Sequence, residues 1–178
     1  MVNVGPFKVE GVPVTHSIMD AVSIAIHTSL GIIIHTGDFK IDPAPIDGRT
    51  TAIHRFSQLG DQGVLLLASD STNATRSGSG PSERVVGPAL KQAVSQCSGK
   101  VVVTTFASNM FRIQQIVDAA VANGRRVAVA GRSLERHMDI TSTLKRLTVP
   151  AGTRVDIKQT STIPHAKLVI ITTGSPRS

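Results

Sequence analysis

Aromatic side chains are scarce in this sequence. Among its 178 residues there is no Trp and no Tyr, and Phe alone makes up the aromatic content of 3%. Proteins that bind single-stranded nucleic acids by stacking the bases on aromatic rings need several such residues. A stacking surface is therefore poorly supplied, and any contact with nucleic acid should depend mainly on phosphate groups.

Cysteine and long hydrophobic runs are scarce as well. Cys97 is the only cysteine, so no disulfide can form within the chain, which is typical of a reducing cytoplasm. No apolar run approaches the roughly 20 residues that span a bilayer. The first residues lack the basic start and the continuous apolar segment of a signal peptide. We therefore expect a cytoplasmic protein without a membrane segment.

Two common nucleotide-binding motifs are also missing. The sequence has neither a Gly-x-Gly-x-x-Gly after a predicted strand nor a Walker-type Gly-Lys-Ser/Thr, so it gives no positive sign of dinucleotide or ATP binding. What the sequence does have is basic charge, with a formal net charge of +7 and an isoelectric point of about 10.3. This excess favours a polyanionic partner, with plain solubility as the alternative.

The apolar residues, 40% of the chain, are arranged as in an α/β protein. Residues 21–28 and 32–36 are β-branched segments separated by Leu30 and Gly31, which predicts a hairpin. After the hairpin, predicted strands alternate with predicted helices along the chain. This alternation predicts parallel β-α-β units. Further strands are predicted at residues 64–68, 101–106, 127–130 and 167–173, and helices at 49–59, 82–99, 109–122 and 134–147.

Two of these predictions carry a specific structural expectation. Residues 64–68 are apolar throughout, which is the pattern of a strand covered on both faces. Ser82 has the position of the N-cap of the helix that follows it.

A histidine and an aspartate lie at the ends of predicted strands on either side of the hairpin. Imidazole and carboxylate groups both bind metals, and loops beside a rigid sheet hold such ligands in place, so His16 and Asp38 are candidate metal ligands. The remaining histidines are expected to have structural or solvent-exposed roles: His27, His35, His54, His137 and His165.

Small polar residues follow four of the predicted strands. In an open parallel sheet ligands bind outside the carboxyl ends of the strands, and the N–H groups at helix N-termini attract phosphate. For Ser108 and Ser133 the alternative is that each merely caps a helix. The candidates for phosphate binding are Ser71, Asn73, Ser108, Asn109, Arg132, Ser133, Gly174 and Ser175.

Six short segments together form a recognisable pattern: residues 14–20, 35–40, 69–73, 106–109, 131–133 and 172–175. This pattern resembles the ribonuclease J family, in the β-CASP group of metallo-β-lactamase-fold nucleases. The resemblance covers nearly the whole chain. It implies a partial metallo-β-lactamase αββα sandwich in residues 1–68, followed by a Rossmann-like parallel β-α-β (β-CASP) region in residues 69–178.

The resemblance also implies roles for three residues. His16 and Asp38 match family motifs that bind two zinc ions, with Asp38 as the bridging ligand. Asp70 matches the acidic first motif of the β-CASP region and is a candidate catalytic residue. Alternatively, the Asp70 carboxylate only caps the backbone N–H groups of Thr72 or Asn73.

The activity implied by the resemblance is zinc-dependent hydrolysis of RNA. Family members degrade RNA from a 5′ monophosphate end, also cut internally, and act in RNA maturation, such as rRNA processing, and in RNA decay. The intact enzyme is expected to be a homo-oligomer. Two alternatives stay open: a noncatalytic phosphate-, nucleotide- or RNA-binding α/β module, and another metallo-β-lactamase-fold hydrolase acting on a small ester or thioester.

The sequence departs from the family pattern in its metal ligands. The family's His-x-His-x-Asp-His motif, which supplies most zinc ligands and the general base, occurs nowhere, and the later histidine motifs are also missing. The last residues, 175–178, leave the family continuation Gly-Ser-Gln-Gly-Glu. We therefore expect an internal fragment of a longer enzyme that by itself binds metal weakly and does not cut RNA detectably.

Overall fold

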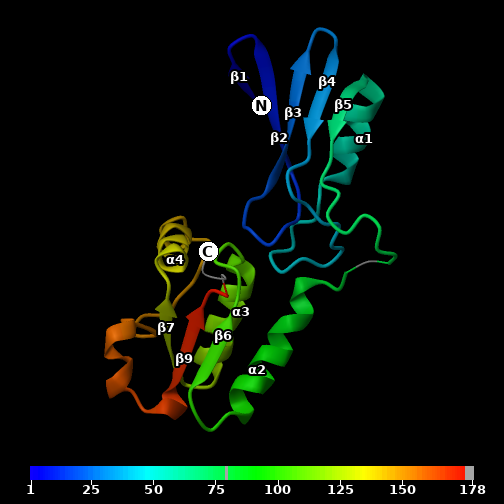
Figure 1. The fold of residues 1–178 in the computed structure, drawn as a ribbon. Coiled ribbons are helices and arrows are strands. Elements are labelled where there is room, and N and C mark those ends of the chain that lie inside the picture. The colour runs from blue at the N-terminus through cyan, green and yellow to red at the C-terminus, as the bar shows by residue number, and fades with distance from the viewer. Residues whose placement is uncertain (79, 175–178) are drawn as a thin grey trace. The chain divides into compact units, whose positions relative to one another are not determined.

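The chain forms two compact units in the computed structural model, which describes residues 1–78 and 80–174 (Figure 1). Unit 1 comprises Met1–His16 and Asp20–Ser82, and unit 2 comprises Ser17–Met19 and Glu83–Ser178. The predicted domain boundary between residues 68 and 69 is not tested by this division and stays a prediction. Within the described residues, no helix combines the length and the hydropathy that a membrane crossing requires.

Unit 1 contains a five-stranded sheet in the order β1-β2-β3-β4-β5. Neighbouring strands are antiparallel except for the parallel pair β4–β5. The predicted hairpin is confirmed as β3 and β4, which turn between Thr28 and Gly31. The strands are β1 (Val2–Val4), β2 (Phe7–Pro13), β3 (Val22–Thr28), β4 (Gly31–His35) and β5 (Val64–Ala68).

One helix, α1 (Ile53–Gln62), covers one face of this sheet (Figure 1). Leu59 of α1 is fully buried against Val12, Ala25, Ile32 and Ile34 of the sheet. The predicted bounds of this helix, residues 49–59, were wrong at both ends. The first helical bonds go to the carbonyl of Ala52, and the helix continues through Gly60 until Gly63 adopts a positive φ of 98°.

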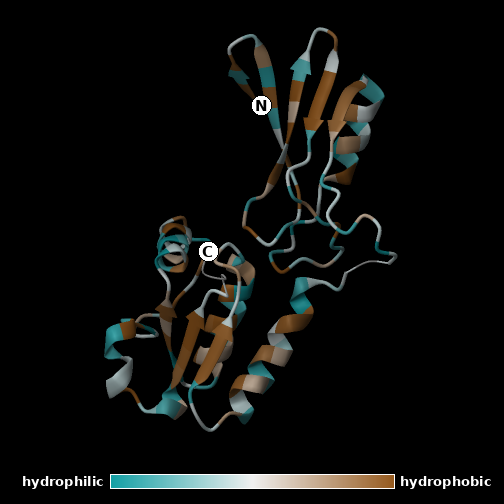
Figure 2. Cartoon of the chain, in the orientation of Figure 1, coloured by the Kyte–Doolittle hydropathy of each residue, from teal (hydrophilic) through white to brown (hydrophobic). Residues whose placement is uncertain are grey.

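The prediction that residues 64–68 are covered on both faces is wrong. In β5, Leu65, Leu66 and Leu67 are 54 to 59% exposed. Successive side chains point to opposite faces of a strand, and the core that α1 forms with β2, β3 and β4 includes no residue of β5, so within the described residues both faces of β5 stay open. β5 is also the edge strand of its sheet. Figure 2 shows the strong apolar character of this strand.

A half-buried ionic contact joins the sheet of unit 1 to α1. Arg55 donates to both carboxylate oxygens of Glu10, from Nε at 2.6 Å and from a terminal nitrogen at 2.8 Å. Nε2 of His27, on the adjacent strand β3, lies 3.2 Å from the same carboxylate, so the structural role expected for His27 is confirmed. The hydrogen bond from Arg55 lowers the pKa of Glu10 from 4.5 to about 2.

Replacing Glu10 with Gln should lower the free energy of unfolding by about 1–3 kcal/mol at neutral pH, because Arg55 loses its charged acceptor. Since the folded state lowers the pKa of Glu10, this stabilisation is present above pH 4.5 and is lost as the pH falls toward 2. Urea unfolding at several pH values measures both effects. The control is Asp61→Asn, which removes an exposed carboxylate of α1. Equal losses in the two variants would contradict the prediction.

Unit 2 contains a four-stranded sheet in which every strand pair is parallel, as predicted. The order is β6-β9-β7-β8, so the last strand lies between the first two. The short strand β8 was not predicted from the sequence. The strands are β6 (Val101–Thr104), β7 (Arg126–Ala130), β8 (Arg154–Val155) and β9 (Leu168–Thr172).

Helices α3 (Met110–Ala122) and α4 (Arg132–Thr143) cover one face of this sheet (Figure 1). Each of these helices lies in the connection between two strands, α3 between β6 and β7 and α4 between β7 and β8. Both connections lead toward the β8 edge of the sheet. The chain then returns from β8 to β9 through η2 (Ile157–Thr162) and η3 (His165–Lys167). Since such crossovers are right-handed, the return runs over the opposite face, where Ile163 packs on Ala128 and Leu168. The carboxyl ends of β6, β9 and β7 therefore meet at one edge.

Helix α2 (Val86–Gln96), which follows the short turn η1 (Glu83–Val85), packs against α3. Its C-terminal end is bound by the buried side chain of Arg125 from the start of β7. The guanidinium donates to the carbonyls of Gly99 at 2.6 Å, Val94 at 3.1 Å and Cys97. Arg125 thus supplies the hydrogen bonds that these carbonyls lack at the end of the helix.

The helix caps differ from the predicted ones. Asn109 caps α3, because its side chain accepts from the backbone N–H of Arg112 at 3.0 Å. Gly131 is the N-cap residue of α4, with a positive φ of 132°. Ser82 does not cap α2, since its hydroxyl donates to the carbonyl of Ala44 at 2.8 Å. The capping alternative is therefore wrong for both Ser108 and Ser133.

Candidate functional site

In unit 1 a backbone bridge brings the segments of His16 and Asp38 side by side. Thr15 and Lys40 form an antiparallel bridge in which the N–H of Lys40 donates to the carbonyl of Thr15 at 2.8 Å. The hydroxyl of Thr51 joins both segments, because it accepts from the N–H of Thr15 and donates to the carbonyl of Lys40, each at 2.9 Å. His16, half-buried, and Asp38, exposed, flank this linked pair in the sequence.

Asp70 follows β5 and is held by a second threonine. Its N–H donates to the hydroxyl of Thr36 at 2.9 Å, and its carboxylate accepts from the N–H of Thr72 at 2.8 Å. The capping contact that we considered for Asp70 therefore exists. Hydrogen bonds from Thr72 and from the backbone of Phe39, with the charge of His16, lower the pKa of Asp70. Asp70 thus lies near both candidate metal ligands of unit 1.

These residues fit a zinc site in their chemistry but do not complete one. Imidazole and carboxylate groups are ordinary zinc ligands, and a catalytic zinc needs about three of them. In the part of the chain that the structure describes, no three His, Cys, Asp or Glu side chains are grouped so that they could hold a metal ion. Any metal held by His16 and Asp38 therefore requires ligands beyond this set.

Two of the phosphate candidates, Ser71 and Asn73, lie in the loop of unit 1 that follows Asp70. Both are exposed, and Asn73 has a positive φ of 62°. The loop is folded by two local backbone bonds, from Ala74 to the carbonyl of Ser71 and from Arg76 to that of Asn73. The remaining phosphate candidates belong to unit 2.

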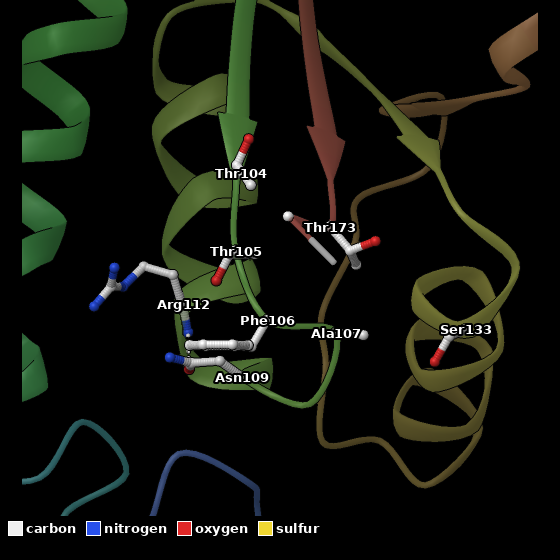
Figure 3. A pocket seen from close by; sticks show the side chains of 9 residues that line it. Thr104, Thr105, Phe106, Ala107, Asn109, Arg112, Ser133 and Thr173 are labelled. Atoms are coloured by element: carbon white, nitrogen blue, oxygen red, sulfur yellow. Dashed lines mark hydrogen bonds between the residues drawn. The ribbon is translucent and has the colours of Figure 1, made fainter. Parts of the chain in front are cut away.

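A pocket of about 530 Å³ opens at the carboxyl edge of the unit 2 sheet (Figure 3). It lies where the strands β6 and β9 end and where α3 and α4 begin. This is the position at which open parallel sheets bind their ligands. The pocket is lined by Thr104, Thr105, Phe106, Ala107, Asn109, Arg112, Ser133, Thr173 and Gly174.

The structure brings together three of the predicted phosphate-binding residues. Asn109, Ser133 and Gly174 line the pocket, whereas Ser108 and Arg132 do not. Ser175 lies outside the described residues. Figure 3 shows Ser133 on α4 with Thr173 between it and the segment that follows β6.

The described residues that line the pocket offer hydrogen-bond donors and include no carboxylate. Asn109 uses its side-chain oxygen as a helix cap, which leaves its NH₂ group as a donor. The hydroxyl of Ser133 has no hydrogen-bond partner among the described residues. A Cβ at Gly174 would lie only 2.8 Å from Cγ2 of Thr104, so this position requires glycine. The donors and the two helix N-termini favour an anionic ligand.

Sequence reasoning missed several residues of this pocket. Strand β6 ends at Thr104 rather than at the predicted residue 106. Thr105 and Phe106 therefore lie after the strand and line the pocket. The side chain of Phe106 is 81% exposed. A correct prediction of where β6 ends would therefore have identified these two residues. No pattern in the sequence indicated that Arg112 lines the pocket. Its Nε donates to a carboxylate oxygen of Glu83 at 2.5 Å.

Comparison with known proteins shows which family the chain is similar to. Residues 98–177 match the family model described as "Ribonuclease J, beta-CASP domain". A curated relative named Ribonuclease J, from Mycobacterium tuberculosis (strain ATCC 25618 / H37Rv), is 48% identical over 171 residues. The match covers 96% of this chain and 31% of the relative.

A second Ribonuclease J, from Helicobacter pylori (strain ATCC 700392 / 26695), is 40% identical over 174 residues. That match covers 98% of this chain and 25% of the relative. This chain thus spans about a quarter to a third of the length of these curated relatives.

A solved structure supports the fold alone. The crystal structure of a protein of unknown function from Enterococcus faecalis V583 matches with a TM-score of 0.63 at 14% sequence identity. The match covers 99% of this chain and 43% of that chain. The fold class expected from the sequence is confirmed, with its parallel sheet and its β-CASP region.

Proposed function

Because this chain belongs to the ribonuclease J family, we propose that it is part of a ribonuclease and that the pocket of unit 2 binds the 5′ monophosphate end of RNA. The observation that carries this proposal is the pocket itself. Among the described residues it combines a hydroxyl without a partner, an amide donor and two helix N-termini, and none of the described carboxylates lines it. A phosphate group would be bound there by hydrogen bonds and by the helix dipoles.

Phe106 gives this pocket a surface for a base. An exposed aromatic ring beside a phosphate site can stack the first base of a single strand, and stacking on one ring is worth about 1–3 kcal/mol. The exposure of Phe106 at the pocket wall supports this role. The scarcity of aromatic residues in the sequence therefore does not prevent a single stacking contact.

We further propose that His16 and Asp38 are two of the zinc ligands of the longer enzyme. A bound zinc pair would supply Lewis acidity to the scissile phosphate and to the attacking water. Asp70, whose pKa is lowered, is ionised at neutral pH and is a weak base, so it would act beside them by holding His16 through its negative charge. It is not suited to donate a proton.

The finer activity belongs to the same proposal. We expect the longer enzyme to degrade RNA in the 5′ to 3′ direction and to cut it internally, in rRNA processing and RNA decay. We also expect it to be cytoplasmic and homo-oligomeric. The present chain alone should not cut RNA detectably, which is supported by the missing third ligand among its described residues. By itself it would then act as an RNA-binding module.

Binding of short RNA tests the phosphate pocket. The chain should bind an RNA with a 5′ monophosphate about 10-fold more tightly than the same RNA with a 5′ hydroxyl, because charge-assisted hydrogen bonds are each worth about 1.5–3 kcal/mol. Ser133→Ala should reduce this preference about 5-fold. Fluorescence anisotropy with both RNAs measures these affinities.

The matched control is Ser95→Ala, a serine on α2 outside the pocket whose hydroxyl donates to the carbonyl of Gln92. It should leave the preference unchanged. Equal affinity of the parent chain for the two RNAs would show that the pocket does not read the 5′ phosphate. A preference for free nucleotides over RNA would favour the noncatalytic nucleotide-binding module instead.

A further inference from the structure

The positive charge of the chain is concentrated in its second half. Residues 83–178 contain fourteen Lys and Arg but only five Asp and Glu, whereas residues 1–82 contain five basic and seven acidic residues. The net charge of +7 therefore arises entirely from the part of the chain that builds unit 2. The pocket at the carboxyl edge accounts for little of it among the described residues, since Arg112 is the only basic residue of that part of the chain that lines it and is paired with Glu83.

Three of these cations lie at the opposite, amino-terminal edge of the unit 2 sheet. Lys100 precedes β6, Lys167 precedes β9, and Arg126 is the first residue of β7. These strands are spatial neighbours in the order β6-β9-β7. Since Val101 pairs with Val169, and Arg126 pairs with Leu168, the three basic residues start adjacent strands at nearly the same level. We call Lys100, Lys167 and Arg126 the basic rim.

A notch of about 380 Å³ opens between two members of the basic rim. It is lined by Gly124, Arg126, Thr162, Ile163, Pro164 and Lys167, with no acidic side chain among them. The amine of Lys167 lies over the turn at Gly124, where a Cβ would be 3.6 Å from Nζ. The notch is therefore concave and carries two positive charges.

The cations of the notch are not neutralised within the described residues. Arg126 and Lys167 are both exposed, and neither has an ion pair or a side-chain hydrogen bond there. Two other arginines of unit 2 do have partners. Arg154 forms an ion pair with Asp139 at 2.5 Å, and the buried Arg125 donates hydrogen bonds to backbone carbonyls. Two unpaired charges held close together repel each other, and a bound anion would relieve that repulsion.

We propose that the basic rim is a second RNA-binding site, which contacts the phosphodiester backbone away from the pocket at the carboxyl edge. The choice of RNA as the anion rests on the proposed function. The notch has no aromatic residue and no amide side chain among its lining residues, so it can bind phosphates but cannot read bases. The site would therefore strengthen binding without regard to sequence or to the state of the 5′ end.

The salt dependence of RNA binding tests this proposal. We compare the parent chain with the double variant Arg126→Ala and Lys167→Ala, using a single-stranded RNA with a 5′ hydroxyl over a series of salt concentrations. Each lost contact with a phosphate of a single strand should reduce the slope of log K against log salt by about 0.7. The double variant should therefore lose about 1.4 in slope and about 10-fold in affinity at low salt.

The matched control is the double variant Lys91→Ala and Arg136→Ala. It removes the same two charges from exposed helical positions of unit 2 that line neither the notch nor the pocket of the carboxyl edge. Its slope should stay close to that of the parent chain, and circular dichroism should show that all variants are folded. Equal changes in slope for the two double variants would overturn the proposal.

Further outcomes separate the basic rim from the 5′ phosphate pocket. Ser133→Ala should reduce the preference for a 5′ phosphate about 5-fold while leaving the salt slope unchanged. The rim variant should lose salt slope while keeping the full preference for a 5′ phosphate. If the parent chain shows no 5′ preference but the rim variant still loses slope, the pocket proposal fails and the basic rim stands. No RNA binding by the parent chain, or a rim-dependent binding only to vesicles of anionic lipid, would overturn the basic rim.

Discussion

Replacing His16 with Ala in a full-length ribonuclease J that carries this stretch should lower the rate of RNA cleavage by about 10³-fold or more. The expected reason is the loss of a neutral nitrogen ligand, since the metal contributes several kcal/mol to stabilising the transition state. Asp38→Asn should have an effect of the same order, because an amide is a far weaker zinc ligand than a carboxylate. Cleavage of a labelled RNA measures the rate.

The zinc content of the same variants separates a metal role from a general loss of structure. His16→Ala should contain less zinc per protein than the parent enzyme by elemental analysis, while its circular dichroism spectrum stays unchanged. His54→Ala is the matched control, because His54 is an exposed histidine of α1 outside this region. Full zinc content and full activity in His16→Ala would rule out the proposed ligand.

Replacing Arg125 with Ala should lower the free energy of unfolding of the chain by about 3–5 kcal/mol. The guanidinium is buried and donates to three carbonyls at the end of α2, and its loss leaves these carbonyls without their donor. Each buried polar group left unpaired costs about 1–3 kcal/mol. Urea unfolding followed by circular dichroism measures the change.

The neighbouring residue supplies a close control for Arg125. Arg126→Ala removes an exposed arginine from the next position of the chain, and such substitutions usually change stability by no more than about 0.5 kcal/mol. The two variants have the same composition and the same net charge, so a difference between them reports on the burial and the hydrogen bonds of Arg125. Equal stabilities would show that Arg125 does not hold the end of α2.

The secondary structure of this chain was largely predictable because it depends on local patterns. The hairpin of β3 and β4 follows from two β-branched segments around Gly31, and α3 from its apolar periodicity. The short strand β8 escaped prediction, because two residues are too few to show a period. Helix ends were less accurate, since neighbouring backbone and tertiary contacts decide which residue caps a helix.

The candidate sites show the same division between local and tertiary signals. His16, Asp38 and Asp70 could be selected because each lies in a short motif at the end of a predicted strand. The exposure of Phe106 could not be predicted, because it depends on where β6 ends against its neighbours. The open faces of β5 also contradicted its apolar sequence, because the sequence of a strand does not show whether other elements pack on its two faces.

By itself the sequence determined the α/β class, the family and the residue types available for binding metal and phosphate, because periodicity and short motifs are properties of neighbouring residues. Only the tertiary structure decided which distant residues act together. The insertion of β9 between β6 and β7 gathers Lys100, Arg126 and Lys167 at one edge of the sheet and Asn109, Ser133 and Gly174 at the other. The physical reason is that strand order is set by packing and by the handedness of the connections, which no local pattern of residues records.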